Sequence, residues 1–231
     1  MTLKSGVEGM KLQFVDKIGV EIEGGFKLGR TLPEDHGIDG SIRSSLPNIQ
    51  MLEIRSKPET LENLRDFIFS HYPDYSNYTC GMHTHVSLKD SEDYLRLLDE
   101  EFFSFFKERM RVWGRLQKIG ASHLFWKRLN NQTLGKRRGK PRTNFCKTDL
   151  TKDNAILQLT GSGDRYCFLN FAHYKYGTVE CRLFPVFKDR PEIAYSAVCE
   201  VVRTIEWWLK QKQGKHGKSH GHKIVREVSV D

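Results

Sequence analysis

Apolar and polar positions alternate with a period of two residues in three short segments of the chain. Residues i and i+2 of a β-strand point to the same face of a sheet, so each segment would present two functional side chains together. Alternation alone would also place such pairs on the solvent-exposed face of a half-buried sheet. Because rare residue types such as His-x-His occur in the set, we predict three strands with one shared functional face. The pairs are Glu21 with Glu23, His83 with His85, and Glu180 with Arg182.

Further patterns complete the predicted architecture. A fourth strand is expected over residues 50–56. Apolar residues at helical spacing predict helices over residues 60–70, from 91 towards 113, and from 191 to about 208. Strands and helices in this order indicate an α+β domain in which helices cover one face of a mainly antiparallel sheet.

Length and composition are typical of one compact domain. The chain has 231 residues, of which 38% are hydrophobic, and we expect one domain over residues 1–210 and a polar, disordered tail over residues 211–231. No apolar stretch reaches the length of a membrane span, and the first residues lack the apolar core of a signal peptide, so a cytoplasmic protein is expected. The five cysteines form no Cys-x-x-Cys pair, which indicates reduced, buried thiols.

The net charge of +8 is concentrated in one part of the chain. Residues 101–150 hold 13 Lys and Arg against three acidic residues, so the other residues together carry −2. The densest run, residues 136–142, contains Gly139 and Pro141, which disfavour helix and strand. We therefore expect residues 121–150 to form a basic, flexible loop. Charge alone leaves three roles open for it: contact with nucleic acid, approach to ATP or another anionic substrate, or a solvated insertion.

The segment over residues 80–88 resembles the Gly-Met-His-x-His-x-Ser-Leu segment of glutamine synthetases. The wider layout is similar to the amidoligase family within the superfamily of glutamine synthetase and glutamate-cysteine ligase, the carboxylate-amine ligases. The resemblance covers residues 19–185 as separate islands, and their number and order make it specific. The other islands are residues 19–23, 39–41, 52–58, 165–166 with Asn170, and 178–182.

This resemblance implies a fold and a reaction. The implied fold is the curved, mainly antiparallel sheet of the glutamine synthetase catalytic domain, with helices on its outer face. The implied reaction is ATP-dependent formation of an amide from a carboxylate and an amine through an acyl phosphate, with release of ADP and phosphate. Small-molecule or peptide acids and amines would be the partners, whereas neither a membrane nor a nucleic acid is expected.

The resemblance also implies roles for matching residues of this chain. The implied ligands of Mg²⁺, or of Mn²⁺ in its place, are Glu21, Glu23, Glu53, His83 and Glu180. The implied contacts to ATP are His85, Ser87 and Arg165. The implied catalytic residues are Arg165, Arg182 and Glu180. Asp39 and Asn170 match further family positions without a defined role.

The chemistry of phosphoryl transfer favours the same residue types. Mg²⁺ prefers hard oxygen ligands such as carboxylates, and one imidazole also suits Mn²⁺. Transfer of the γ-phosphoryl group needs positioning and charge neutralisation, which metal ions and arginines supply. The chain is too short to include the separate N-terminal β-domain of a glutamine synthetase, so the oligomeric state is not carried over.

Two functions from other classes compete with this interpretation. A metal-dependent hydrolase could use the His-x-His pair and the carboxylates without ATP, although such sites typically contain more than two histidines. The other internal histidines, which have no ligand spacing, are His36, His71, His123 and His173. A nucleic-acid-binding protein is the third candidate, because the pI is about 9.2 and the basic segment is dense.

Overall fold

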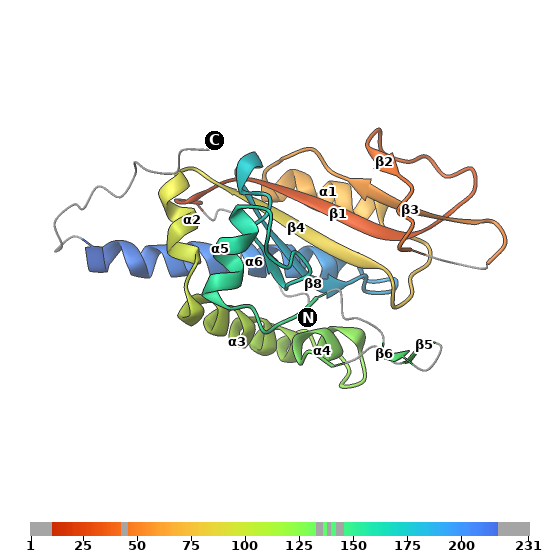
Figure 1. Cartoon of the computed structure of the whole chain (residues 1–231). Helices are drawn as coiled ribbons and strands as arrows, with labels where there is room; N and C mark the ends of the chain where they lie inside the picture. Colours follow the sequence, from red (N-terminus) through yellow and green to blue (C-terminus); the bar gives the residue numbers. More distant parts are fainter. Residues whose placement is uncertain (1–10, 43–45, 133–135, 138–139, 142–145, 217–231) are drawn as a thin grey trace.

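The computed structural model describes residues 11–42, 46–132, 136–137, 140–141 and 146–216. Its main feature is an antiparallel sheet of six strands in the order β2-β3-β1-β4-β8-β7, with helices packed around it (Figure 1). The predicted α+β fold with an antiparallel sheet is therefore confirmed. The strands are β1 (Val15–Lys27), β2 (His36–Gly37), β3 (Ile49–Arg55), β4 (Gly81–Leu88), β7 (Leu169–Asn170) and β8 (Thr178–Pro185).

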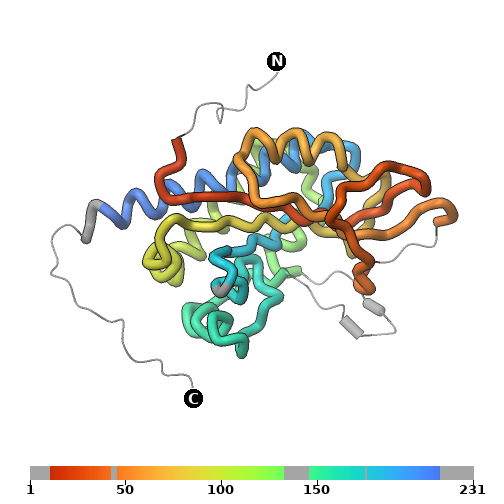
Figure 2. The backbone as a smooth tube through the Cα atoms, turned by 90° about the horizontal axis from the view of Figure 1, so that it is seen from above, coloured from red at the N-terminus to blue at the C-terminus, as the bar shows by residue number. Residues whose placement is uncertain are grey.

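Helices α1 and α6 pack against each other and against the central strands β1 and β4. In the view from above, the segment around α5 lies on the other side of these strands from α1 (Figure 2). The helices in the described residues are α1 (Leu61–His71), α2 (Ser91–Leu97), α3 (Glu100–Leu116), α4 (Leu124–Leu129), α5 (Lys152–Leu159), η1 (Tyr174–Tyr176, 3-10) and α6 (Pro191–His216).

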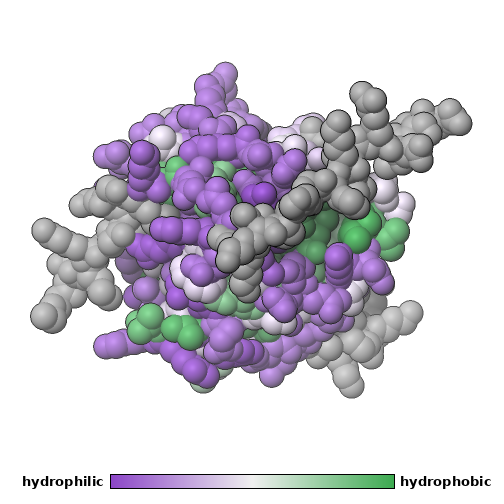
Figure 3. Space-filling view, turned by 90° about the vertical axis from the view of Figure 1, so that its left-hand side faces the viewer, coloured by the Kyte–Doolittle hydropathy of each residue, from purple (hydrophilic) through white to green (hydrophobic). Residues whose placement is uncertain are grey.

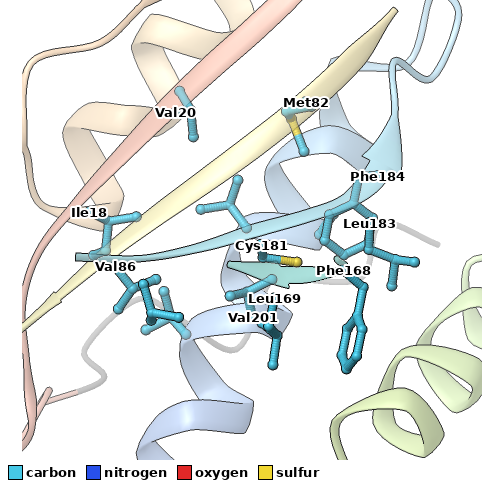
Figure 4. Packing of buried hydrophobic residues seen from close by; sticks show 14 of the residues in the cluster. Ile18, Val20, Met82, Val86, Phe168, Leu169, Cys181, Leu183, Phe184 and Val201 are labelled. Carbon is cyan, nitrogen blue, oxygen red and sulfur yellow. The ribbon is translucent and has the colours of Figure 1, made fainter. Parts of the chain in front are cut away.

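The apolar residues of the alternating strands form the core between the sheet and α6. Ile18 and Val20 of β1 and Met82 and Val86 of β4 are at most 2% exposed, and Val201 of α6 is fully buried (Figure 4). Each such side chain contributes about 1.5–3 kcal/mol on burial. This packing explains the predicted alternation. The face of β1 and β4 that contacts the helices must be apolar, which leaves the opposite face for polar residues.

The helix predicted from residue 91 towards 113 is two helices, α2 and α3. The first begins after Asp90, whose carboxylate accepts a hydrogen bond from the Glu92 amide at 2.9 Å. The second begins after Asp99, which accepts from the Glu101 amide at 2.8 Å. A second capping aspartate inside an amphipathic stretch starts a new helix, because its side chain satisfies free amide groups of the first turn.

Helix α6 begins at Pro191 as predicted but extends to His216. The prediction of a disordered tail was therefore wrong for residues 211–216, which continue the helix. Residues 217–231 of the expected tail lie outside the described part of the chain. Lys212 in this last part bonds Asp99 at 2.8 Å, and this contact between α6 and the start of α3 favours the longer helix.

The predicted basic loop over residues 121–150 contains regular structure. Residues 124–129 form α4, which His123 caps by accepting a hydrogen bond from the Phe125 amide at 3.2 Å. Two short strands, β5 (Lys136–Arg137) and β6 (Lys140–Pro141), pair with each other despite the predicted breakers. Residues 133–135, 138–139 and 142–145 lie outside the described residues, so the three roles considered for the basic segment stay open.

The face of the molecule in Figure 3 is mostly hydrophilic, and its hydrophobic side chains gather only in small groups. Among the described residues, we find no helix that combines the length and the apolar character needed to cross a membrane.

All five cysteines are buried thiols outside any disulfide, as predicted. Burial raises the pKa of the Cys146 thiol to about 12 and those of Cys167 and Cys199 to about 11. A thiol reagent attacks the thiolate, so both the protonation and the burial of these groups slow the reaction.

We therefore predict that a disulfide reagent at pH 8 labels the native protein far more slowly than a free thiol. After denaturation all five cysteines should react, which gives the total for comparison. Rapid labelling of any cysteine in the native protein would contradict the packing described here.

Candidate active site

Antiparallel pairing brings the predicted functional side chains onto one face of the sheet. The register places Glu23 of β1 opposite Glu53 of β3. On the other side of β1, Glu21 lies opposite His83 of β4. The next residue of β4 on this face, His85, lies opposite Glu180 of β8. Side chains from four neighbouring strands thus meet at one place.

His83 lies at the centre of this group and is 4% exposed. Its Nδ1 is 3.0 Å from Glu21 Oε1 and 3.2 Å from Glu180 Oε1. Its Nε2 is 4.0 Å from Glu23 Oε1. His85 extends the contacts, with its Nε2 3.6 Å from Glu21 Oε2. The sequence-predicted metal ligands of β1, β4 and β8 therefore converge around one imidazole.

Glu23 is the least satisfied of the buried carboxylates. It is 7% exposed, and no described residue donates a hydrogen bond to it; His83 holds the only basic nitrogen in the described part within 4.0 Å. Burial, reinforced by the charge of Glu21, raises the pKa of Glu23. Burial disfavours the charged form of a carboxyl group, and a cation bound in the adjoining cavity would offset this effect.

Two sets of three side chains are close enough to hold a metal ion, and Glu23 belongs to both. Each set offers one ligand atom per residue, and the atoms lie within 4.8 Å of one another. Sharing of one carboxylate is typical of centres with two adjacent metal ions. The sets are Glu21 with Glu23 and His83, and Glu23 with Asp39 and Glu53.

Carboxylates and imidazoles shift one another's ionisation. Burial alone would raise the pKa of Glu21, but its hydrogen bond with His83 and the nearby imidazole of His85 hold this pKa well below the usual range. Burial also opposes ionisation of Glu180, yet its hydrogen bond with His173 and the charge of His83 lower the pKa of this carboxyl strongly. Both carboxylates are therefore ionised and able to bind a cation at neutral pH.

Glu180 is 1% exposed and is held by side chains on both of its oxygens. Arg182 Nη1 donates to Oε1 at 2.5 Å, and Asn170 Nδ2 donates to Oε2 at 2.7 Å. A carboxylate offers about four lone-pair directions, so these two bonds, together with the approach of His83 and His173, fix the orientation of Glu180. Asn170, which matched the family without a role, thus positions Glu180.

His173 is a site residue that the sequence did not reveal. Its Nε2 lies 3.3 Å from Glu180 Oε2, and its ring packs edge-on against His85 with centroids 5.5 Å apart. The residue precedes η1, between β7 and β8. Neither a period nor a motif marks such a position, so only the approach of β7 to β8 brings His173 to the site.

Two cavities lie at the sides of this group of residues. The smaller has a volume of about 160 Å³ and is lined in part by Arg165 and Arg182. The larger has a volume of about 370 Å³ and is lined in part by His85 and Ser87. The structure therefore does not bring Arg165 together with the other two residues expected to contact ATP. The smaller cavity is lined by Glu23, Asp39, Ser41, Thr79, His83, Arg128, Arg165, Tyr166 and Arg182.

Arginines add positive charge that the sequence analysis assigned only in part. Arg128 of α4 is buried in the wall of the smaller cavity and donates to the carbonyls of Phe184 at 2.7 Å and Cys80 at 2.9 Å. Arg182 Nε is buried and has no hydrogen-bond partner among the described residues. Arg55, on the side of the larger cavity, forms an ion pair with Glu53.

These donor sets fit divalent cations. Carboxylate oxygens are the ligands that Mg²⁺ prefers, and the single histidine of the first set is compatible with a transition metal. The shared, donor-free Glu23 is the observation that favours occupancy by ions over a purely structural role.

Comparison of the chain with protein-family models, with curated proteins and with solved structures gave no match.

Gly81 leaves the space that this centre needs. A Cβ atom at this position would lie 3.0 Å from Glu23 Oε2 and 3.2 Å from His83 Nε2. We predict that Gly81→Ala displaces both side chains and weakens binding of Mn²⁺ by on the order of tenfold, as changes around metal ligands commonly do. Isothermal titration calorimetry measures the affinity.

The control is Gly120→Ala, because a Cβ atom there meets nothing within 4 Å. It should bind Mn²⁺ as the wild type does. Wild-type affinity in Gly81→Ala, with the same melting temperature, would show that this contact is unimportant.

Proposed function

We propose that this protein is an ATP-dependent carboxylate-amine ligase, built on the glutamine synthetase type of sheet. The observation that carries the proposal is the buried Glu23, which no described residue satisfies and which two potential metal-binding sets share. Two adjacent divalent ions between two cavities suit a reaction that joins a nucleotide phosphate to a second substrate.

Divalent ions bound by Glu21, Glu23, Glu53, His83 and Glu180 would neutralise the phosphates of ATP. The protein's own residues then have separable tasks. Asn170 and Arg182 orient Glu180 through hydrogen bonds. The second ring nitrogen of His83, Nε2, lies 4.0 Å from Glu23 Oε1. Because these groups are fixed by hydrogen bonds before a substrate arrives, little reorganisation is needed in the transition state.

The larger cavity is our choice for the nucleotide. Its volume of about 370 Å³ lies in the range of small-molecule sites. Lys17 and Arg55 bring positive charge to its lining, and His85 lies where the cavity meets the carboxylates. Cationic groups near a triphosphate neutralise charge, while Tyr176 offers an aromatic surface for the base.

The smaller cavity is our choice for the acid. Arg165 and Arg182 line it together with the buried Arg128. Arginine binds carboxylates and phosphates through paired donors, so this lining suits both the substrate carboxylate and the transferred phosphoryl group.

The proposed reaction has two steps. A carboxylate oxygen of the acid attacks the γ-phosphorus of ATP, the bond to the bridging oxygen breaks, and ADP leaves. The nitrogen of a neutral amine then attacks the acyl carbon, the carbon–oxygen bond to phosphate breaks, and the nitrogen proton passes to the leaving phosphate. Arg165 and Arg182, which line the smaller cavity, would stabilise the negative charge of the acyl phosphate.

A metal-dependent hydrolase is the second candidate, and His173 is the observation that favours it. With His173 beside Glu180 and His85, the site contains three imidazoles, which is more than the sequence indicated. Hydrolytic zinc centres commonly combine several histidines with carboxylates. Such an enzyme would need no nucleotide.

The first test is calorimetric titration with Mg²⁺ and a non-hydrolysable ATP analogue. We predict that the wild type binds the analogue only with the metal present. Glu21→Gln and Glu180→Gln should each weaken this binding by on the order of tenfold to a hundredfold, because each removes a charged ligand of the ion. Release of ADP with trial acids and amines should fall in parallel.

Glu62→Gln is the matched control, since Glu62 is exposed in the first turn of α1. Its binding and melting temperature should equal those of the wild type. Metal-independent binding, or full binding by either site variant, would reject the metal assignment. A folded wild type that binds zinc but no nucleotide would favour the hydrolase.

A further inference from the structure

The two potential metal-binding sets differ in their chemistry. The set formed by Glu21, Glu23 and His83 includes an imidazole, whereas the set formed by Glu23, Asp39 and Glu53 consists of carboxylates alone. Imidazole nitrogen is a borderline ligand that transition metals accept readily, whereas Mg²⁺ prefers six oxygen ligands and keeps several waters. The same shared carboxylate thus lies between two unlike environments.

More imidazoles lie near the set of Glu21, Glu23 and His83 than the one that belongs to it. Glu21 lies between two histidines, with Oε1 3.0 Å from His83 Nδ1 and Oε2 3.6 Å from His85 Nε2. His173 stands behind His85 and next to Glu180. Imidazole nitrogens therefore lie around the carboxylates of Glu21 and Glu180.

The oxygen side has a different character. Glu53 comes from β3 and Asp39 from the segment after β2, and Asp39 accepts a hydrogen bond from the Ser41 amide at 2.7 Å. The basic partner of Glu53 is Arg55, whose guanidinium is a cation and not a metal ligand. Only carboxylate oxygen, together with water, would coordinate an ion here.

The buried carboxylate of Glu23, which receives no hydrogen bond from the described residues, is the observation that supports binding of ions by these sets. It is 7% exposed, the nearest basic nitrogen among the described residues is His83 Nε2 at 4.0 Å, and Asp39 on its other side is a second acid. A single ion on either side would satisfy it, and its two oxygens allow one ion on each side.

We propose that the centre holds two different metals: Mg²⁺ at Glu23–Asp39–Glu53 and a first-row transition metal ion at Glu21–Glu23–His83. This inference rests on the metal ligands of the proposed function, but not on the ligase reaction itself. The transition metal position is fixed by His83, and the Mg²⁺ position is fixed by Asp39.

The experiment titrates Co²⁺ into the metal-free protein in the presence and absence of excess Mg²⁺, without nucleotide. One Co²⁺ should stay bound in excess Mg²⁺, and a second should be displaced. Because neither ATP nor turnover is measured, failure of the ligase proposal would leave this result intact, and failure here would leave a ligase with two equal Mg²⁺ ions.

Two variants should separate the positions. His83→Asn should abolish the Mg²⁺-resistant Co²⁺ and keep the exchangeable site, whereas Asp39→Asn should do the reverse, each loss being on the order of tenfold or more in affinity. The controls are His36→Asn and Asp66→Asn, two exposed residues of β2 and α1 outside both sets. Both controls should titrate as the wild type does.

X-ray absorption at the cobalt edge gives a readout that needs no variant, which matters if His83→Asn does not fold. Wild-type protein loaded with a single equivalent of Co²⁺ should show the scattering signature of an imidazole ligand. Absence of that signature, displacement of all Co²⁺ by Mg²⁺, or no binding of Co²⁺ at all would each overturn the proposal.

Discussion

The antiparallel register of β1 between β3 and β4 is the constraint on which the candidate site depends. It sets Glu23 beside Glu53 and Glu21 beside His83. A slip by one residue would turn every polar side chain of β1 into the core and every apolar one outward, so the packing of Ile18 and its neighbours against the helices also fixes the site.

The candidate site lowers the stability of the fold. Buried carboxylates from three strands repel one another and lose water, and hydrogen bonds from Asn170 and Arg182 compensate only Glu180. The apolar face, covered by α1 and α6, supplies the stability that the polar face lacks. Such local conflict with stability is characteristic of functional sites.

The arrangement also gives the two cavities a common boundary. Glu21 and His85 line the larger cavity, whereas Glu23 and His83 line the smaller, so neighbouring residues of the same strands face different cavities. A ligand in either cavity would therefore meet the same row of carboxylates and imidazoles. This connection makes group transfer between two bound molecules physically reasonable, because the reacting groups would be held on one rigid sheet.

The sequence by itself determined four of the six strands, the helical character of three stretches and the face that carries Glu21, Glu23, His83 and Glu180, because periods of two and of 3.6 residues are local properties of strands and helices. Only the tertiary structure decided which strands are neighbours and which of their residues lie opposite one another. It brought His173 and Arg128 to the site, separated Arg165 from His85, and set Asp39 beside Glu23. His173, Arg128, Arg165 and Asp39 lie outside the strands and helices that periodicity predicted. Their positions depend on contacts between distant parts of the chain, which local pattern does not encode.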